Sequence, residues 1–243
     1  MKNIDNWVET KYIIKKGQLR GTKNKNYLAI SSRLIADLVA INYDCALKNY
    51  AKGNLIDLGC GNVPFYVLYS RIGVSVTCAD WEHKNEHLDI VCDFNCIPLP
   101  IESNSYDTVV LSDVLEHIKF PDKFFNEISR IMKKGGYLIL NTPFFYMIHE
   151  APDDYYRYTK YAFNIFAKQA ELDIVQISPY GGVIECISDL NCKLAVKIPF
   201  VGRFLSEFIR ILCVGIGKTS IGMKIQSKSS KSITLGYFVI MRK

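Results

Sequence analysis

The residues around Asp57 have the types and spacing that a nucleotide-like cofactor requires. Residues 54–58 form a mostly apolar run that is typical of a buried strand. Gly59 and Gly61 follow directly, and residues 65–72 have the apolar spacing of a helix. Glycine lets a ligand lie against the backbone, and the N-terminus of the next helix offers free N–H groups. The segment therefore predicts a strand–turn–helix ligand cradle.

The spacing of this turn indicates which kind of ligand it holds. A dinucleotide-binding turn places a third glycine where this sequence has Pro64, so a pyrophosphate ligand is disfavoured. The carboxyl group of Asp57, just before the glycines, suits a cationic ligand better than a phosphate. An ordinary tight turn between a strand and a helix is the alternative interpretation.

Polar residues close each of the next predicted strands as well. Alternation of strands with helical segments predicts a parallel sheet, in which the carboxyl ends of the strands meet at one edge. These side chains should therefore converge on one site. The predicted strands span residues 55–58, 74–79, 88–92 and 106–111, and the polar residues at their ends are Asp57, Asp80, Asp93, Ser112 and Asp113.

Three motifs give the chain a family resemblance over roughly residues 50–180. They are Asp57-Leu-Gly-Cys-Gly61, Asp113-Val-Leu-Glu-His-Ile118 and Glu127-Ile-Ser-Arg-Ile-Met-Lys-Lys-Gly-Gly136. Together they resemble the class I S-adenosylmethionine-dependent methyltransferases, the type 11 group in particular. The resemblance implies a Rossmann-like, seven-stranded, mostly parallel α/β sheet with helices on both faces and an antiparallel last strand. It also implies S-adenosylmethionine as cofactor and S-adenosylhomocysteine as product.

The resemblance assigns roles to the residues at the strand ends. Asp80 lies 19 residues after Gly61, the spacing at which an acid binds the two ribose hydroxyls. Asp93 offers a carboxylate to the adenine amino group and Phe94 an aromatic face to the ring, while Asp57 would hold the methionyl ammonium. The predicted cofactor-binding residues are Asp57, Gly59, Cys60, Gly61, Asp80, Trp81, Asp93, Phe94, Ser112 and Asp113.

Residues 142–159 form a second focus, rich in tyrosine, acids, one His and one Arg. The segment resembles a His-x-x-Pro-x-Asp-Tyr-x-Arg-Tyr-Thr signature of methyltransferases found among cell-surface glycan biosynthesis proteins. His149 is the candidate general base, because an imidazole titrates near neutral pH. Asp153 or Asp154 could orient it. The alternative is that His149 and Arg157 only brace the loop. The predicted substrate-binding residues are Asp154, Tyr155, Arg157 and Tyr158.

Two further histidine patterns receive other interpretations. His117, after the fourth strand, is expected to make a structural hydrogen bond. The pattern His83-x3-His87-x4-Cys92-x3-Cys96 contains zinc-binding residue types, but it lacks Cys-x2-Cys spacing and falls in the predicted adenine region. We therefore assign no metal site from the sequence.

Composition and charge limit the remaining possibilities. The net charge of +6 is unevenly distributed, with basic ends around an acidic body, which disfavours a nucleic-acid enzyme whose cleft would be basic. No signal peptide and no spanning segment are expected, and the eight scattered cysteines are typical of reduced core thiols. We expect a cytoplasmic protein, with the inner face of the membrane as an alternative location.

The chain is expected to divide into an arm, a methyltransferase domain and an insertion. The arm spans residues 1–24 and should be irregular; the domain spans 25–182 and 232–243, and the helical insertion spans 183–231, before the last strand. Apolar residues between 199 and 216 form one helical stripe, and residues 193–231 carry eight Lys or Arg against one acid. The stripe could pack as a lid, form a homodimer, or contact an anionic membrane reversibly.

These observations predict a methyltransferase that O-methylates a sugar or a glycan-lipid intermediate. A small aromatic or quinone-like metabolite is the alternative acceptor, because a tyrosine-rich loop could form a stacking wall. A nucleotide-binding regulatory module with a vestigial fold is the alternative outside enzyme chemistry. The acceptor rests on the resemblance of residues 142–159 rather than on spacing.

Overall fold

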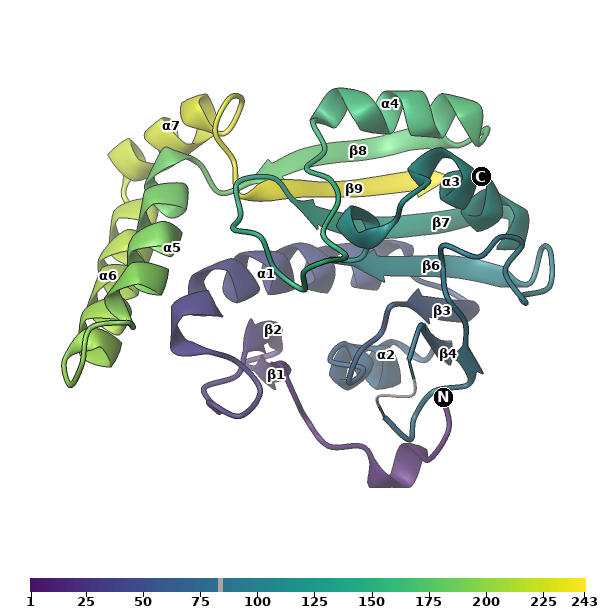
Figure 1. Ribbon diagram of the computed structural model, residues 1–243, viewed down its shortest axis with the longest axis horizontal. Coiled ribbons are helices and arrows are strands. Elements are labelled where there is room, and N and C mark those ends of the chain that lie inside the picture. Colours follow the sequence, from purple (N-terminus) through teal and green to yellow (C-terminus); the bar gives the residue numbers. More distant parts are fainter. Residues whose placement is uncertain (83–84) are drawn as a thin grey trace.

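The computed structural model describes residues 1–82 and 85–243, which form one seven-stranded sheet and a small two-stranded one (Figure 1). Six strands of the large sheet run in one direction, while β9 is antiparallel to its neighbours β7 and β8. This arrangement confirms the predicted fold class. In spatial order the strands are β5 (Ile90–Val91), β4 (Ser75–Asp80), β3 (Asn54–Leu58), β6 (Tyr106–Ser112), β7 (Met132–Pro143), β9 (Gly236–Arg242) and β8 (Asp173–Tyr180).

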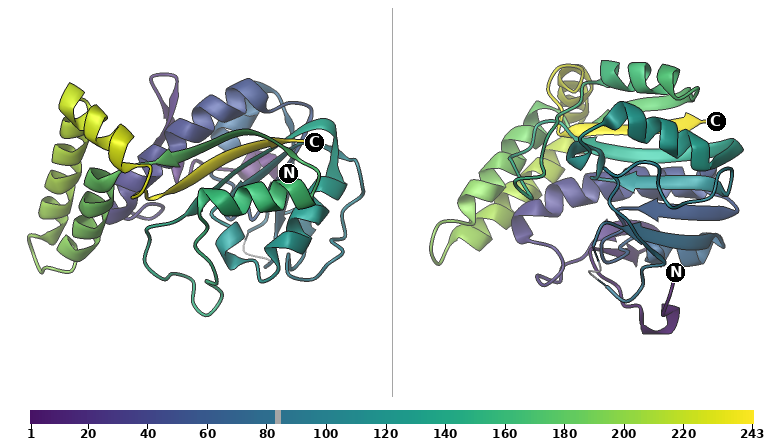
Figure 2. Two further views of the ribbon diagram at one scale, coloured as in Figure 1. Left: turned by 90° about the horizontal axis from the view of Figure 1, so that it is seen from above. Right: turned by 45° about the vertical axis from the view of Figure 1, so that its right-hand side comes forward.

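Helices cover both faces of the sheet because the buried strands are apolar on both faces. Leu55 and Val110 face α1 (Arg33–Tyr50) and α2 (Tyr66–Ile72), whereas the next residue of β3, Ile56, packs with the core on the opposite face. That opposite core is closed by α3 (Pro121–Ile131) and α4 (Lys160–Gln169), and Figure 2 shows α1 and α4 on opposite sides of the strands. The alternation along each strand thus builds two cores.

Several element boundaries differ from those predicted. The helical spacing of residues 25–50 predicts a helix from Lys25, but α1 begins at Arg33, because residues 24–29 turn before it and the Arg33 guanidinium donates to the Lys23 carbonyl. Residues 121–134, with Gly135 and Gly136 after them, predict a helix that ends at Lys134, but α3 ends at Ile131 and Met132 already pairs with Tyr106 in the sheet. The third predicted strand is only two residues long.

The N-terminal arm is not irregular as expected but contains a hairpin of β1 (Tyr12–Lys15) and β2 (Gln18–Gly21). Lys16 and Gly17 connect the strands with φ of 51° and 75°, the conformation of a tight hairpin turn. Tyr12 is buried and stacks on Phe65, with 4.9 Å between the ring centroids. The arm therefore packs on the predicted cradle.

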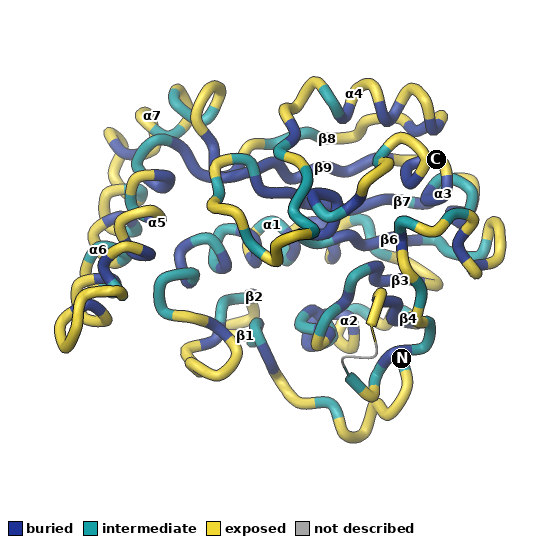
Figure 3. The backbone as a smooth tube through the Cα atoms, viewed as in Figure 1, coloured by how far each residue is buried: buried dark blue, intermediate teal, exposed yellow. Residues whose placement is uncertain are grey.

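The region 183–231 consists of α5 (Val183–Ala195), α6 (Gly202–Gly217) and α7 (Ser220–Ser229), grouped beyond the carboxyl ends of the parallel strands (Figure 1). A Cβ on Gly202 would lie 2.2 Å from the Ala195 carbonyl oxygen, so α6 approaches α5 through its small residues. The apolar stripe of α6 is exposed instead (Figure 3). Among the described residues, no helix is long and apolar enough to cross a bilayer. The domain boundaries remain predictions.

Candidate active site

The turn after β3 brings its backbone close to the following segment. Gly59 has a φ of 76° and donates its N–H to the Ala79 carbonyl, 2.8 Å away. A Cβ at Gly59 would lie 2.3 Å from Cγ2 of Val114, so only glycine fits there. Gly61 also has positive φ, and nothing lies within 4 Å of the position that its Cβ would take. The turn is thus closed on the Val114 side and open at Gly61.

Two carboxyl groups flank this turn. Asp80 is buried and accepts the backbone N–H of Gly61 at 2.7 Å and that of Trp81 at 2.8 Å. Asp57 is buried and accepts the Tyr69 hydroxyl at 2.9 Å. Burial raises the pKa of Asp57 to about 7, opposed by this hydrogen bond and reinforced by Asp80. A cationic group entering beside Asp57 would stabilise its charged form.

Two cavities meet at the cradle. The first, of about 380 Å³, extends past Asp80 and Phe94, and the second, of about 330 Å³, extends past Asp57 towards the N-terminal arm. Gly59, Gly61 and Asp113 line both. All ten predicted cofactor-binding residues line one or both cavities, so the structure brings them together. A cavity with a carboxyl group at each end and an apolar wall fits an adenosine joined to a cationic amino acid.

A polar network behind the cavities includes two residues that sequence reasoning missed. The buried side chain of Asn141 accepts the hydroxyls of Tyr43 and Ser112, both at 2.9 Å, and donates to Asp113 at 2.5 Å. Asp113 has a φ of 53°. The network holds the predicted residues Ser112 and Asp113 in place. The apolar run of residues 137–141 predicts a fifth strand that ends at Asn141, so its place at a strand end was the signal in the sequence.

A third cavity, of about 350 Å³, lies beside the first two and shares Asp113 and Glu150 with them. The predicted base, His149, lines it. Its aromatic wall comes from residues that the sequence analysis did not assign to a site, namely Tyr12, Tyr27 and Tyr146. This third cavity is the space available for an acceptor beside the cofactor cavities.

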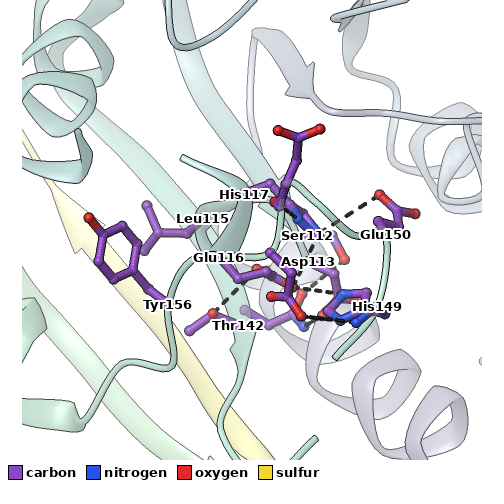
Figure 4. Close-up of polar contacts among 12 residues, drawn as sticks. Ser112, Asp113, Leu115, Glu116, His117, Thr142, His149, Glu150 and Tyr156 are labelled. Carbon is purple, nitrogen blue, oxygen red and sulfur yellow. Dashed lines mark hydrogen bonds and ion pairs between the residues drawn. The ribbon is translucent and has the colours of Figure 1, made fainter. Parts of the chain in front are cut away.

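Glu116 lies beneath this third cavity, fully buried, and faces two imidazole rings (Figure 4). Its Oε1 is 3.6 Å from Nε2 of His149 and 3.9 Å from Nε2 of His117. Burial raises the pKa of the Glu116 carboxyl, while the Glu116 carboxylate raises the pKa of His149. Glu116 and His117 are adjacent in the motif Asp113-Val-Leu-Glu-His, which was the signal in the sequence, but the sequence analysis gave Glu116 no role.

Asp153 and Asp154 hold the two histidines, His117 through Nδ1 and His149 through its backbone N–H. The Nδ1 of His149 lies 3.3 Å from Oδ2 of Asp154, which also accepts the backbone N–H of His149 at 2.9 Å. The Nδ1–H of His117 donates to the Asp153 carbonyl at 2.6 Å. The structural hydrogen bond expected of His117 is therefore present. His117 also lines the first and third cavities, which the sequence analysis did not anticipate.

The four predicted substrate-binding residues lie outside the three cavities and have other partners. Arg157 donates to both carboxylate oxygens of Asp154, at 2.5 and 2.7 Å, and to the Met147 carbonyl at 3.2 Å. Tyr155 donates to Asp153, and the buried Tyr158 donates to the Leu115 carbonyl. These contacts correspond to the alternative in which the loop braces itself. A role in substrate binding stays a prediction.

The cysteine–histidine pattern does not form a site in the part of the chain that the structure describes. His83 lies outside the described residues. The ring of His87 contacts the Lys2 carbonyl at 3.2 Å, and Cys96 donates to Asp93. The cluster of metal-binding residue types in residues 1–82 and 85–243 is a different one, formed by Glu116, His117 and His149.

Comparison with known proteins places this geometry in a family. Residues 56–140, which include the cradle, Asp80, Asp93 and Asp113, match the family model described as a methyltransferase domain. The sheet order with its antiparallel β9 is that of the class I fold. This segment therefore matches a methyltransferase domain, and the fold is that of the class I S-adenosylmethionine-dependent methyltransferases, as the motifs predicted.

Individual proteins and solved structures resemble this chain at low sequence identity. A ubiquinone biosynthesis O-methyltransferase of Pelagibacter ubique is 25% identical over 123 residues, which are 46% of this chain and 50% of that protein. The [4+2]-cyclase SpnF superposes with a TM-score of 0.56 at 14% identity, over 97% of this chain and 88% of its own. Phosphoethanolamine N-methyltransferase 2 of Haemonchus contortus, solved with S-adenosylmethionine, superposes with a TM-score of 0.54 at 17% identity. The match covers 90% of this chain and 57% of that one.

These similarities have definite limits. The chain spans about half the length of the curated relatives that it matches. The two solved structures are below 25% identity, so they show a shared fold. One of them is a cyclase and the other a methyltransferase. The reaction of this chain must consequently be inferred from its own site.

Proposed function

We propose that this protein transfers the methyl group of S-adenosylmethionine to a hydroxyl group of an acceptor. The observation that carries the proposal is the meeting of three cavities at Asp113 and Glu150, with the cradle on one side and the imidazole–carboxylate group on the other. Asp80 would bind the ribose, Phe94 the adenine and Asp57 the ammonium group. When bound, the cofactor supplies an electrophilic methyl group on a sulfonium.

The residues of the chain then have two tasks. The walls of the third cavity orient the acceptor, so that its hydroxyl oxygen can form a bond to the methyl carbon as the carbon–sulfur bond breaks. The bonding pair returns to sulfur, and the hydroxyl proton leaves towards the group of Glu116, His117 and His149. His149 as the base remains the prediction from sequence, supported by its position on the third cavity.

For the acceptor we propose a sugar or a glycan-lipid intermediate. The resemblance of residues 142–159 supports this choice, and so does the exposed apolar surface near the third cavity. Phe145 and Met147 of the loop and Leu190 of α5 are exposed and line one common hollow. Such a surface would let the enzyme work at the cytoplasmic face of a membrane, beside a lipid-linked acceptor. Homodimerisation through residues 199–216 is the competing use of the exposed apolar stripe on α6.

A second acceptor class, a small aromatic or quinone-like phenol, has its own support. Tyr12, Tyr27 and Tyr146 line the third cavity together with aliphatic residues such as Ile35 and Val39. Aromatic walls of this kind stack on a flat ring. The relative from Pelagibacter ubique is by name an O-methyltransferase of ubiquinone biosynthesis, which is consistent with this class.

Turnover with a methyl-labelled cofactor separates these possibilities. The purified chain is incubated with labelled S-adenosylmethionine and either undecaprenyl-linked sugars or polyprenylated catechols, and label in each acceptor is counted. We expect label in the sugar-lipid fraction and S-adenosylhomocysteine in equal amount. Label only in the catechols would establish the second class. Binding of S-adenosylhomocysteine without transfer to either panel would contradict the proposed acceptors and favour a regulatory module.

A further inference from the structure

We propose that Glu116, His117 and His149 bind one divalent cation of the first transition row, at the boundary between the cofactor and acceptor cavities. One ligand atom from each residue lies within 4.8 Å of the other two. Figure 4 shows the three side chains turned towards one another, with Glu150 beyond His117. No such site was expected from the sequence.

The separations between these atoms suit ligands around a metal better than they suit hydrogen bonds. Oε1 of Glu116 is 3.6 Å from Nε2 of His149 and 3.9 Å from Nε2 of His117, beyond hydrogen-bonding distance. Metal–ligand bonds of about 2.0–2.2 Å place neighbouring ligand atoms roughly 3–4 Å apart. An ion can therefore enter with small side-chain movements.

The buried carboxylate supplies a second, independent observation. Glu116 has an exposed fraction of 0%, and its Oε1 accepts no hydrogen bond from any residue that the structure describes. Its other oxygen, Oε2, is 3.4 Å from the Thr142 hydroxyl. A buried carboxylate oxygen without a partner is costly to maintain, and a bound cation removes that cost.

The two imidazoles have the outer contacts that metal-binding histidines show. A ligating histidine usually donates its second ring N–H to a carboxylate or a backbone carbonyl, which fixes the tautomer and the ring orientation. His117 does so through Nδ1 to the Asp153 carbonyl, whereas Nδ1 of His149 lies 3.3 Å from Oδ2 of Asp154 and makes no hydrogen bond among the described residues. In both rings Nε2 is left pointing at Glu116.

The donor set indicates the class of ion. Two imidazoles with one carboxylate suit Zn²⁺, Fe²⁺, Co²⁺ or Mn²⁺, whereas Mg²⁺ prefers an oxygen shell. The side chains of His117 and His149 are 16% and 27% exposed and line the third cavity, so open coordination positions would face the acceptor. Three protein ligands with open positions are typical of a catalytic rather than a structural site.

Such an ion would take part in the proposed methyl transfer. This role of the ion rests on the proposed function, whereas the metal site itself does not. An acceptor hydroxyl bound to the ion loses its proton more readily, because the cation stabilises the alkoxide. With the ion bound, Nε2 of His149 is a ligand and cannot accept the proton. The proton then passes to the carboxylate of Glu150 instead, which lies 3.9 Å from Nε2 of His117 and is 68% exposed to water. The alkoxide oxygen then forms the bond to the methyl carbon, and the sulfur keeps the electron pair of the bond that breaks.

Metal binding is measured directly, apart from turnover. The full chain is stripped with a chelator and titrated with Co²⁺, followed by its visible absorption, and with Zn²⁺ and Mn²⁺ by calorimetry. We expect one ion per chain. Glu116→Gln and His149→Gln should each weaken binding by more than the 10–100-fold that loss of an outer-shell partner costs. His87→Gln is the matched control and should bind as the unaltered chain does, because His87 is partly exposed and lies outside the cluster.

The outcomes are distinct from those that test the methyl transfer. Affinity for S-adenosylhomocysteine and the melting temperature show whether the Gln variants remain folded. Binding of metal to the unaltered chain no tighter than to a folded Glu116→Gln variant would overturn the site. Stoichiometric binding together with full turnover of the stripped enzyme would overturn its role at the acceptor. Absence of any methyl transfer, with one ion still bound per chain, would contradict the proposed function while upholding the site.

Discussion

At the residue scale, Gly59 shows how closely the cradle depends on one missing Cβ. Gly59→Ala would bring Cβ to 2.3 Å from Val114 and retain a φ of 76°. We expect a loss of S-adenosylhomocysteine binding by calorimetry and a lower melting temperature. Gly73→Ala is the matched control, because its φ is 72° and nothing lies within 4 Å of the added Cβ. That control should cost only the backbone strain, about 1–2 kcal/mol.

The clash itself can be relieved by a second change. Val114→Ala shortens the side chain that the new Cβ meets, so the double variant should regain part of the lost affinity. Equal effects of Gly59→Ala and Gly73→Ala on stability and binding would mean that strain alone matters and that the close approach to Val114 does not.

Asp57 should make cofactor affinity depend on pH. Burial raises its folded-state pKa from 3.8 to about 7, so its neutral form favours folding at low pH and this contribution is lost as the pH rises through 7. Binding of a cationic ammonium group requires the charged form. Affinity for S-adenosylhomocysteine should therefore fall by about tenfold per pH unit below 7.

The Asn variant supplies the control for this titration. Asp57→Asn should bind more weakly at pH 8 and show a flatter affinity between pH 5 and 8. In the ligand-free protein it should also remove the part of the pH dependence of the melting temperature that lies between pH 4 and 7. An identical pH profile of affinity in the two proteins would place the ammonium group elsewhere.

The cofactor residues could be predicted from the sequence because strand topology determines their position. Asp57, Asp80 and Asp113 end parallel strands, so any parallel arrangement brings them to one edge. Glu116 could not be assigned in the same way. It follows a strand end by several residues, and its partners His117 and His149 come together only through the path of the loop after β7.

At the scale of elements, the predicted acceptor residues of the loop 142–159 have partners that residue types alone could not indicate. Its tyrosines and Arg157 are polar enough to bind a substrate, yet they bond to their own loop and to the backbone carbonyls of Leu115 and Lys119. Leu115 begins the short helix Leu115–His117 and Lys119 follows that helix, whose exact length the sequence does not reveal. The hairpin that turns at Lys16 and Gly17 was also not predicted, although glycine is a residue type that favours such a turn.

Arg157→Lys tests whether this loop braces itself or binds the acceptor. Lysine cannot reproduce the two-pronged contact with Asp154, at 2.5 and 2.7 Å. We expect faster hydrogen exchange of the amides of residues 144–157, on the order of 1 kcal/mol in local stability, with lower kcat and unchanged S-adenosylhomocysteine affinity. Unchanged exchange with a higher KM for an acidic acceptor would instead support the substrate role predicted from sequence.

At the scale of the whole molecule, the helical region 183–231 places an apolar surface beside the site. The side chains of Phe200, Phe204 and Phe208 are 98%, 80% and 57% exposed. Basic residues that are exposed on the same region are Lys197, Arg203, Lys218, Lys224, Lys228 and Lys231. The periodicity of α6 was predictable, but the direction that it faces depends on its contacts with α5. Gly202 has no side chain and lies against the Ala195 carbonyl, and the carbonyl of the buried Ser206 accepts the Cys192 thiol.

We expect this surface to bind vesicles that contain anionic lipid, in a flotation assay. Full burial of each phenylalanine would contribute about 1.5–3 kcal/mol, and each nearby lysine or arginine about 1 kcal/mol. Phe200→Ser, Phe204→Ser and Phe208→Ser together should abolish flotation, because the apolar contribution is lost while the charge is kept. High salt should weaken binding of the unaltered chain by screening the charged contribution.

A matched variant on the far side of the molecule controls for a general loss of apolar surface. Tyr161 and Ile165 of α4 are 68% and 59% exposed, and α4 lies away from α6 (Figure 1). Tyr161→Ser with Ile165→Ser should float as the unaltered chain does. Sedimentation of the same proteins tests the competing use of the stripe. A dimer that the triple substitution dissociates, in a chain that never floats, would assign the stripe to a second copy and leave the lipid-linked acceptor without its physical support.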